Sequence, residues 1–225
     1  MATGKKYIFV IAGGPLGDND FFRAEVARFG PAALVCADGG ARHLDALAMA
    51  PEVIIGDMDS LPPEFLEQCA ARGCRIIRHP RTKKETDTQL ALEYAWKLLP
   101  HEVRVYGSMG ARLDHTLANI FLLAAAKQGV ATKLVDEWCE VFLVTKKTVI
   151  EGTAGQTVSL FPLSAPVEGI NLEGFAYPLS GGTMEIGAPY GISNLLLAER
   201  AVISVASGSL LVVKYHHPDR FPGSI

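Results

Sequence analysis

Two aspartates lie one residue apart in the stretch PEVIIGDMDSL, at the end of an apolar run. The side chains of Asp57 and Asp59 carry like charges, which repel each other unless a cation lies between them. Carboxylate oxygens are the ligands that a hard cation such as Mg²⁺ prefers. The pair therefore predicts a metal site immediately after a buried strand.

Other aspartates follow other apolar runs. Asp38 follows AALVCA, Asp87 lies in the segment after CRIIRH, and Asp114 lies in the segment after EVRVYG. A single aspartate of this kind is more often a turn residue or a helix cap. In an open α/β sheet, however, ligands bind outside the carboxyl ends of the strands, so acids at several strand ends converge on one edge. Their convergence again indicates a bound cation.

Basic residues accompany these acids. They precede Asp87 and Asp114 in the sequence and are Arg78, Arg81, Lys83, Lys84 and Arg112. Magnesium usually keeps several waters and takes one or two carboxylates together with substrate phosphates. Arginine and lysine pair with phosphate oxygens, although a run of charges alone is also typical of a solvated loop. The combination of acids and bases favours a phosphate-containing substrate, and Lys84 is predicted to contact it.

Residues 86–89, Thr-Asp-Thr-Gln, also match a capping box, with Thr86 as the N-cap residue and Gln89 returning to it. In that arrangement the helix dipole favours Asp87 in the first turn. For Thr86 the structural role is the expected one. For Asp87 metal binding and helix stabilisation are both open.

Apolar runs alternate with helical patterns over the first part of the chain. The predicted strands are KYIFVIA, AALVCA, EVIIGD, CRIIRH, EVRVYG and ATKLVD, and the clearest helices span 87–99 and 115–127. This alternation is typical of a mostly parallel sheet covered by helices. Later segments are short, β-rich and divided by Gly, Pro and Ser, which indicates an antiparallel sandwich or barrel. We expect an α/β domain over 1–140 and a smaller all-β sandwich domain over 141–225.

Composition excludes several classes of protein. The 225 residues are 49% hydrophobic and carry a net charge of −3, so no global basic field predicts binding to nucleic acid. No stretch approaches the length of a membrane span, and we expect a cytoplasmic protein without membrane contacts. The P-loop motif GxxxxGK[ST] is absent, and the glycine spacing in AGGPLGDND does not match a dinucleotide-binding loop.

Two alternatives remain on the residues alone. VIIGDMDSL is similar to the opening motif of Mg²⁺-dependent aspartyl-phosphate phosphatases, in which Asp57 would be the nucleophile. A non-catalytic sensor of a nucleotide or vitamin could use the same cleft, although a binder gains little from several carboxylates directed at an anion.

Five segments, in order along nearly the whole chain, resemble the bacterial thiamine pyrophosphokinases: CADGGARHL, PEVIIGDMDSL, KETDTQLALEYA, GARLDHTLANIFLL and GISNLLL. The resemblance implies an α/β nucleotide domain, a C-terminal β-sandwich that binds thiamine, and a homodimer. It also implies an enzyme that transfers the pyrophosphoryl group of ATP to the hydroxyl of thiamine, giving thiamine diphosphate and AMP. Mg²⁺ would be the cofactor and ATP the co-substrate.

The resemblance also implies roles for individual residues. Four acids would bind the Mg²⁺ and the triphosphate: Asp38, Asp57, Asp59 and Asp87. Of these, Asp57, Asp59 and Asp87 are the expected metal ligands. Arg112, Asp114 and His115 would line the nucleotide side, and Ser193 with Asn194 would contact thiamine from the β domain. We expect Asp59, Asp87 and Arg112 to act in catalysis, with Asp87 or another nearby carboxylate accepting the proton of the alcohol.

Overall fold

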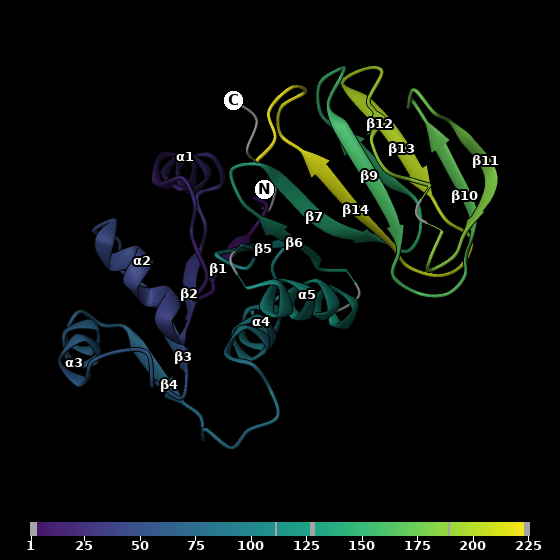
Figure 1. Ribbon diagram of the computed structural model, residues 1–225. Coiled ribbons are helices and arrows are strands. Elements are labelled where there is room, and N and C mark those ends of the chain that lie inside the picture. Colours follow the sequence, from purple (N-terminus) through teal and green to yellow (C-terminus); the bar gives the residue numbers. More distant parts are fainter. Residues whose placement is uncertain (1–3, 111, 127–128, 189, 223–225) are drawn as a thin grey trace. The chain divides into compact units, whose positions relative to one another are not determined.

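The computed structural model describes residues 4–110, 112–126, 129–188 and 190–222 (Figure 1). The chain forms two units, Met1–Glu137 and Trp138–Ile225, whereas the sequence places the border after residue 140. Each unit has a hydrophobic core of its own. The two units are therefore described separately.

The first unit contains a parallel sheet. Its strands are β1 (Tyr7–Ile11), β2 (Ala33–Ala37), β3 (Val53–Gly56), β4 (Arg75–Arg78), β5 (Glu102–Tyr106) and β6 (Ala131–Val135). They pair in the order β6-β5-β1-β2-β3-β4, and every pair is parallel. The prediction of a parallel sheet is confirmed. Because β1 lies between β2 and β5, the winding of the chain reverses there, and such a switch point is where open α/β sheets bind ligands.

Helices cover both faces of this sheet. They are α1 (Asn19–Phe29), α2 (Ala41–Ala46), α3 (Pro63–Ala71), α4 (Asp87–Lys97) and α5 (Leu113–Leu122), with 3₁₀ turns η1 (Asp38–Gly40) and η2 (Leu123–Ala125). In Figure 1, α1, α2 and α3 lie on one side of the strands and α4 and α5 on the other. The first group packs Phe22, Leu44 and Leu66 onto Phe9 and Ile54 of the strands. Strands buried on both faces read as continuous apolar runs, which explains why the sequence located them.

The two predicted helices begin near their expected positions and end earlier. The helix predicted over 87–99 is α4, which stops at Lys97, and the helix predicted over 115–127 is α5 followed by η2. Lys127 lies outside the described residues. Thr86 is the N-cap of α4, because its Oγ1 accepts a hydrogen bond of 3.1 Å from the Gln89 N–H. The Gln89 side chain donates to Glu93 Oε1 at 3.1 Å instead of returning to Thr86, so the capping-box prediction is wrong for Gln89.

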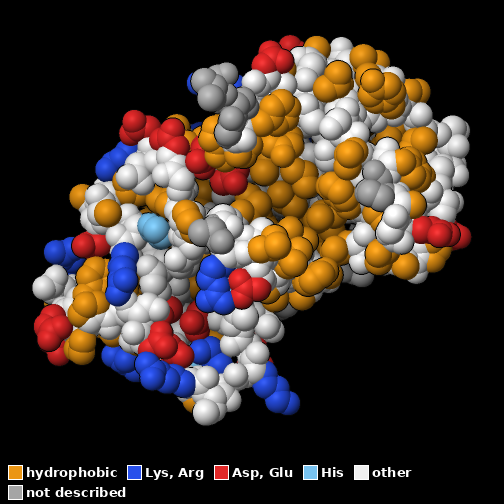
Figure 2. Space-filling model, in the orientation of Figure 1, with side chains coloured by type: hydrophobic (Ala, Val, Ile, Leu, Met, Phe, Trp, Pro, Cys, Tyr) orange, Lys and Arg blue, Asp and Glu red, His pale blue; other side chains and the backbone are white. Residues whose placement is uncertain are grey.

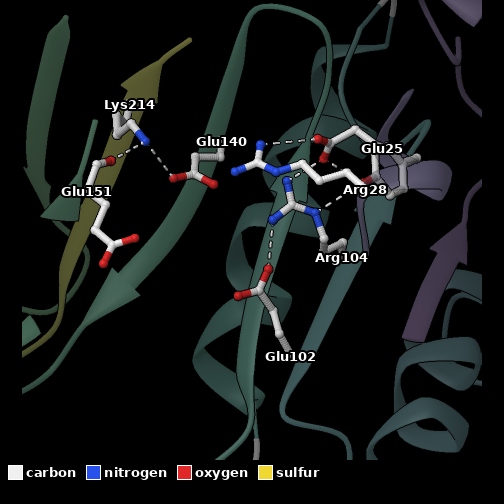
Figure 3. Close-up of polar contacts among 8 residues, drawn as sticks. Glu25, Arg28, Glu102, Arg104, Glu140, Glu151 and Lys214 are labelled. Atoms are coloured by element: carbon white, nitrogen blue, oxygen red, sulfur yellow. Dashed lines mark hydrogen bonds and ion pairs between the residues drawn. The ribbon is translucent and has the colours of Figure 1, made fainter. Parts of the chain in front are cut away.

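A buried polar network joins α1 to β5 (Figure 3). Arg104 on β5 donates to Glu25 of α1 at 2.6 Å and to Glu102 at 2.7 Å. Arg104 Nε also donates to the Tyr106 hydroxyl, which donates to Glu25, both at 3.0 Å. Burial acts to lower the pKa of Arg104, but Tyr106 and the two carboxylates raise it overall, so the guanidinium stays charged. This network fixes α1 against the strand that ends at the candidate site.

The second unit is an antiparallel sandwich. Its strands are β7 (Cys139–Val144), β8 (Thr148–Glu151), β9 (Thr157–Pro162), β10 (Val167–Glu173), β11 (Leu179–Met184), β12 (Asn194–Leu195), β13 (Arg200–Ser204) and β14 (Leu210–Tyr215). One sheet has the order β12-β9-β14-β7 and the other β11-β10-β13-β8. Leu160 and Val212 of the first sheet share a core with Ile170 and Ile203 of the second. The predicted all-β sandwich is confirmed.

A second buried ion pair lies in this sandwich. Lys214 Nζ is 3.2 Å from Glu140 Oε1 and donates to the Glu151 carbonyl at 2.8 Å (Figure 3). Among the helices of the described residues, none is long and apolar enough to cross a membrane.

Candidate functional site

A cavity of about 730 Å³ opens at the switch point of the parallel sheet. The loops after β1, β2 and β5 line it, together with the β4–α4 connection and the first turns of α4 and α5. The lining residues that the structure describes all belong to the first unit. The cavity is large enough for a nucleotide, since ligand pockets are commonly 300–1,000 Å³.

Two glycines bring the walls of this cavity together. The Gly14 N–H donates to the Gly107 carbonyl at 3.0 Å, and a Cβ on Gly14 would lie 2.5 Å from that oxygen. Gly107 itself has a φ of 63°, a conformation that residues with side chains rarely adopt. The glycine-rich segment after β1 therefore serves close approach of two loops.

Three carboxylates gather beside the cavity, and of these Asp38 is among its described lining residues, whereas Asp57 and Asp59 are not. Asp38, Asp57 and Asp59 each offer an oxygen, and these oxygens lie within 4.8 Å of one another. Asp38 Oδ2 accepts a hydrogen bond of 3.2 Å from the Ser60 N–H, whereas its buried Oδ1 has no hydrogen-bond partner among the described residues. Burial raises the pKa of Asp38, and the nearby Asp87 and Asp59 add to the rise. A buried oxygen without a partner among clustered acids is the arrangement that a divalent cation would stabilise.

The turn between β3 and α3 brings two of these acids together. Met58 has a φ of 63° and its side chain is buried in the core of the first unit. The Asp59 N–H donates to Asp57 Oδ1 at 3.2 Å, which closes the turn. Because Met58 takes the left-handed conformation, the residues on either side of it can both contribute carboxylates to the cluster.

Lys83 supplies the positive charge inside the cluster. Its Nζ lies 2.9 Å from Asp87 Oδ1 and 3.5 Å from Asp57 Oδ2. Partial burial acts to raise the pKa of Asp57, but the Asp59 N–H and the Lys83 ammonium lower it overall. Burial in turn acts to lower the pKa of Lys83, and its hydrogen bonds and charge interactions with Asp87 and Asp57 raise it.

The other members of the basic run lie further out. Arg81 is exposed and its Nη2 is 3.4 Å from Asp59 Oδ2, while Arg78 and Lys84 are exposed. Lys83 lines the cavity and Lys84 is not among the described lining residues. The structure thus brings Lys83 to the acids, and the predicted contact of Lys84 with the substrate stays a prediction.

Gly56, the last residue of β3, allows two acids to meet. A Cβ at this position would lie 2.9 Å from the Cβ of Asp38 and 3.0 Å from the carboxyl carbon of Asp87. Any side chain here would therefore push apart an acid that follows β2 and an acid that begins α4. In the sequence, Gly56 belongs to the stretch that contains Asp57 and Asp59, and nothing there indicated that it makes room for Asp38 and Asp87.

The predicted nucleotide side lies at the start of α5. Arg112 forms a two-point ion pair with Asp114, with Nε–Oδ1 and Nη2–Oδ2 distances of 3.2 and 2.5 Å. Arg112 lowers the pKa of Asp114. Arg112 and His115 line the cavity, whereas Asp114 is not among the described lining residues. An exposed pair of this kind contributes little to stability.

Sequence reasoning missed two residues of the cavity wall. Arg42 and His43 begin α2, one turn after Asp38, and both line the cavity. His43 Nε2 lies 2.8 Å from the Gly14 carbonyl oxygen, and Arg42 donates to the Ser60 carbonyl. The sequence could have indicated them, because they follow Asp38, an acid at the end of a strand, by about one helical turn.

The predicted thiamine contacts lie in the second unit. Ser193 is exposed, has a φ of 57°, and donates its N–H to Ser159 Oγ at 3.1 Å. Asn194 is buried, and its side chain bonds to both backbone groups of Tyr177, accepting at 2.9 Å and donating at 2.7 Å. The Asn194 side chain thus holds the neighbouring loop, and contact with a ligand stays a prediction for both residues.

Charged side chains concentrate on the first unit. Figure 2 shows acidic and basic groups side by side around the β4–α4 connection, and a mainly apolar surface over β7, β14 and β9 of the second unit. The mixed charges coincide with the segment that carries Arg81 and Lys83.

Comparison with protein families gives two matches. The model described as "Thiamin pyrophosphokinase, catalytic domain" matches residues 31–134, and the model described as "Thiamin pyrophosphokinase, vitamin B1 binding domain" matches residues 145–210. The first match contains the acidic cluster and Lys83, and the second contains Ser193 and Asn194. Together the two matches span most of the chain.

Individual relatives agree with these matches. The chain is 26% identical over 215 residues to the thiamine pyrophosphokinase of Bacillus subtilis, covering 93% of this chain and 98% of the relative. It is 29% identical over 195 residues to thiamine pyrophosphokinase 2 of rice, covering 75% and 73%. The crystal structure of the Bacillus subtilis protein superposes with a TM-score of 0.81 at 25% identity, covering 93% of this chain and 99% of that one.

Proposed function

The chain belongs to the thiamine pyrophosphokinase family, and we propose that the cavity of its first unit binds Mg²⁺ and ATP for transfer of pyrophosphate to thiamine. The observation that carries the proposal is the cluster of Asp38, Asp57 and Asp59 beside a nucleotide-sized cavity. An unpartnered buried oxygen within the cluster supports cation binding.

Asp57, Asp59 and Asp87 are the proposed metal ligands, with Asp38 beside them. The family implies Mg²⁺, and clustered carboxylate oxygens are the donors that suit it. When bound, Mg²⁺ neutralises charge on the triphosphate and polarises its phosphoryl oxygens. Arg112, from the start of α5, neutralises further phosphate charge.

The proposed reaction is a direct displacement. The hydroxyl oxygen of thiamine attacks the β-phosphorus of ATP, and the bond between that phosphorus and the oxygen bridging to the α-phosphorus breaks. The products are thiamine diphosphate and AMP. Asp87, which lines the cavity at the first residue of α4, accepts the proton of the hydroxyl. Most of the rate enhancement in such transfers comes from positioning and charge neutralisation.

Thiamine is proposed to contact the second unit through Ser193 and Asn194. The match to a vitamin B1 binding model over residues 145–210 supports this assignment. The other proposed residues are Lys84, Asp114 and His115, which lie at or near the nucleotide side of the first unit.

The test is a product assay with the purified protein, ATP and Mg²⁺, with and without thiamine. We expect AMP and thiamine diphosphate to appear together in phosphorus NMR spectra, and only when thiamine is present. Release of inorganic phosphate without thiamine would indicate the phosphatase reaction instead. Binding of ATP without any turnover would indicate a sensor.

The homodimer and the cytoplasmic location implied by the family resemblance are also proposals. Light scattering coupled to gel filtration tests the first: we expect about twice the chain mass of 24.1 kDa. A mass of one chain would contradict it. Fractionation of cells that express the protein tests the second.

A further inference from the structure

We infer that Lys83 is a tethered cation that holds the place of the metal between Asp57 and Asp87 until Mg²⁺ and ATP bind, and then turns to the triphosphate. The inference rests on the proposed function, because it concerns the same cavity. It assigns to Lys83 two successive partners, first the carboxylates and then the phosphates.

The first support is the position of the ammonium group. Lys83 Nζ lies 2.9 Å from Asp87 Oδ1 and 3.5 Å from Asp57 Oδ2, so it spans acids from two different elements. Its side chain is only 11% exposed. The next residue, Lys84, is exposed and forms no ion pair that the described residues show. The contact therefore belongs to Lys83 specifically.

The second support is the balance of charge. Asp87 lies beside the cluster of Asp38, Asp57 and Asp59, and the cations that pair with these four acids among the described residues are Lys83 and Arg81. The ionised acids exceed these cations by two charges, which matches one divalent ion. A metal at Asp57 would repel the Lys83 ammonium, since both cations would share one carboxylate. Binding of the metal therefore favours departure of Lys83.

The third support is the reach of the side chain. Lys83 lines the cavity as well as the acidic cluster. Lysine carries a compact charge on a flexible stem with four carbons and binds phosphate as a point charge. Movement of the ammonium from Asp87 to a phosphate oxygen would also release the carboxylate proposed to accept the proton of thiamine.

Metal binding without nucleotide gives the first test. The protein is titrated with Mg²⁺ by calorimetry and with Mn²⁺ by electron paramagnetic resonance, at pH 7.5, with no nucleotide or thiamine present. We expect Lys83→Met to bind both metals about three- to tenfold more tightly than the wild type, because a competing cation is gone. Lys83→Arg, which keeps the charge, and Lys97→Met, which removes an exposed charge from the last turn of α4, should stay within about twofold.

Nucleotide binding gives the second test. Loss of the Lys83 charge should weaken the binding of nucleotide, whereas it should strengthen the binding of metal. With saturating Mg²⁺, we expect Lys83→Met to bind α,β-methylene-ATP about tenfold more weakly than the wild type. A variant that is only misfolded would weaken both titrations, and thermal melting followed by circular dichroism identifies that case. Lys83→Gln then replaces Lys83→Met in both titrations.

The outcomes separate this inference from the proposed function. Equal or weaker binding of metal by folded Lys83→Met and Lys83→Gln would overturn the placeholder role, whatever the product assay shows. Tighter binding of metal together with no formation of AMP would leave that role intact and overturn the proposed reaction.

Discussion

The acids of the site come together through the backbone as much as through charge. Asp57 and Asp59 flank Met58, whose positive φ and buried side chain set the turn between β3 and α3. Asp38 contributes an oxygen that no described residue satisfies. The backbone therefore sets the positions of Asp57 and Asp59 before a metal ion binds, which lowers the entropy cost of binding one.

Asp57→Asn and Asp59→Asn test this set of ligands. Each removes one charged oxygen and keeps the shape of the side chain. We expect kcat/KM to fall at least about a hundredfold, because metal ions supply several kcal/mol of charge stabilisation. The fold should be retained in circular dichroism spectra. Asp20→Asn, an exposed acid in the first turn of α1, is the control and should retain wild-type turnover; turnover near the wild type in both site variants would contradict their role.

Gly56→Ala tests the convergence of Asp38 and Asp87. The added Cβ would lie 2.9 Å from the Cβ of Asp38 and must move that acid or the strand. We expect a loss of about 1–3 kcal/mol in the free energy of unfolding and weaker binding of Mg²⁺. Denaturant unfolding and calorimetry measure the two effects. Gly4→Ala, where an added Cβ meets nothing within 4 Å, should change neither.

The sequence indicated which acids converge, but not which of two neighbouring lysines contacts them. Asp38, Asp57 and Asp87 were located because strand ends of a parallel sheet share one edge. Lys83 and Lys84 are adjacent and chemically identical, and only the path of the β4–α4 connection decides which one reaches the acids. Arg42 and His43 were missed because their position depends on how α2 leaves η1.

The link between α1 and β5 is a buried ion pair surrounded by aromatic rings. Glu25 and Arg104 are both nearly inaccessible, and the Arg104 guanidinium lies 4.3 Å from the centre of the Phe29 ring. Tyr106, which joins the network, directly precedes the loop that forms one wall of the cavity. Removal of Glu25 would take from the buried Arg104 one of the carboxylates that pair with it, which is costly in a buried network.

Glu25→Ala tests this link between elements. We expect a loss of about 3–5 kcal/mol in the free energy of unfolding, because Arg104 keeps its charge but loses a carboxylate. Urea unfolding followed by tryptophan fluorescence measures it. Arg28 also pairs with Glu25, at 3.8 Å, but its side chain is 74% exposed, so Arg28→Ala should cost less than about 1 kcal/mol. Equal losses in the two variants would mean that burial is not what gives the pair its strength.

Element positions were predicted better than element ends. All six apolar runs of the first unit are strands, and those at the centre of the sheet are apolar at nearly every position because helices cover both faces. Helix ends depend on tertiary contacts: α5 gives way to a 3₁₀ turn at Leu123, and the Gln89 side chain bonds within its own helix. Local patterns do not contain this information.

The folding of the first unit controls the reactivity of the cysteine thiols that it buries. Cys36, Cys69 and Cys74 are free thiols buried in the core of the first unit. Burial raises the pKa of Cys74 to about 11, with Cys69 adding to the rise. Because the reactive form is the thiolate, these residues should be unreactive in the folded protein near neutral pH.

Thiol labelling tests this protection. We expect iodoacetamide at pH 8 to modify Cys36, Cys69 and Cys74 slowly in the native protein and rapidly in guanidinium chloride, as mapped by mass spectrometry. The raised pKa means that the thiolate of Cys74 increases only as pH approaches 11, so labelling should rise over that range. Rapid native labelling of Cys74 at pH 8 would show that the first unit opens far more readily than its packing implies.

The position of Met58 also makes the geometry of the acidic cluster depend on the oxidation state of one buried sulfur. Its thioether is buried among apolar side chains while the residues on either side of it belong to the acidic cluster. Conversion of this sulfur to a sulfoxide would place a polar group in the core and displace the turn. Oxidation of the Met58 side chain would thus move the carboxylates of Asp57 and Asp59 apart without modifying either of them. Reduction of the sulfoxide by a reductase would restore their positions.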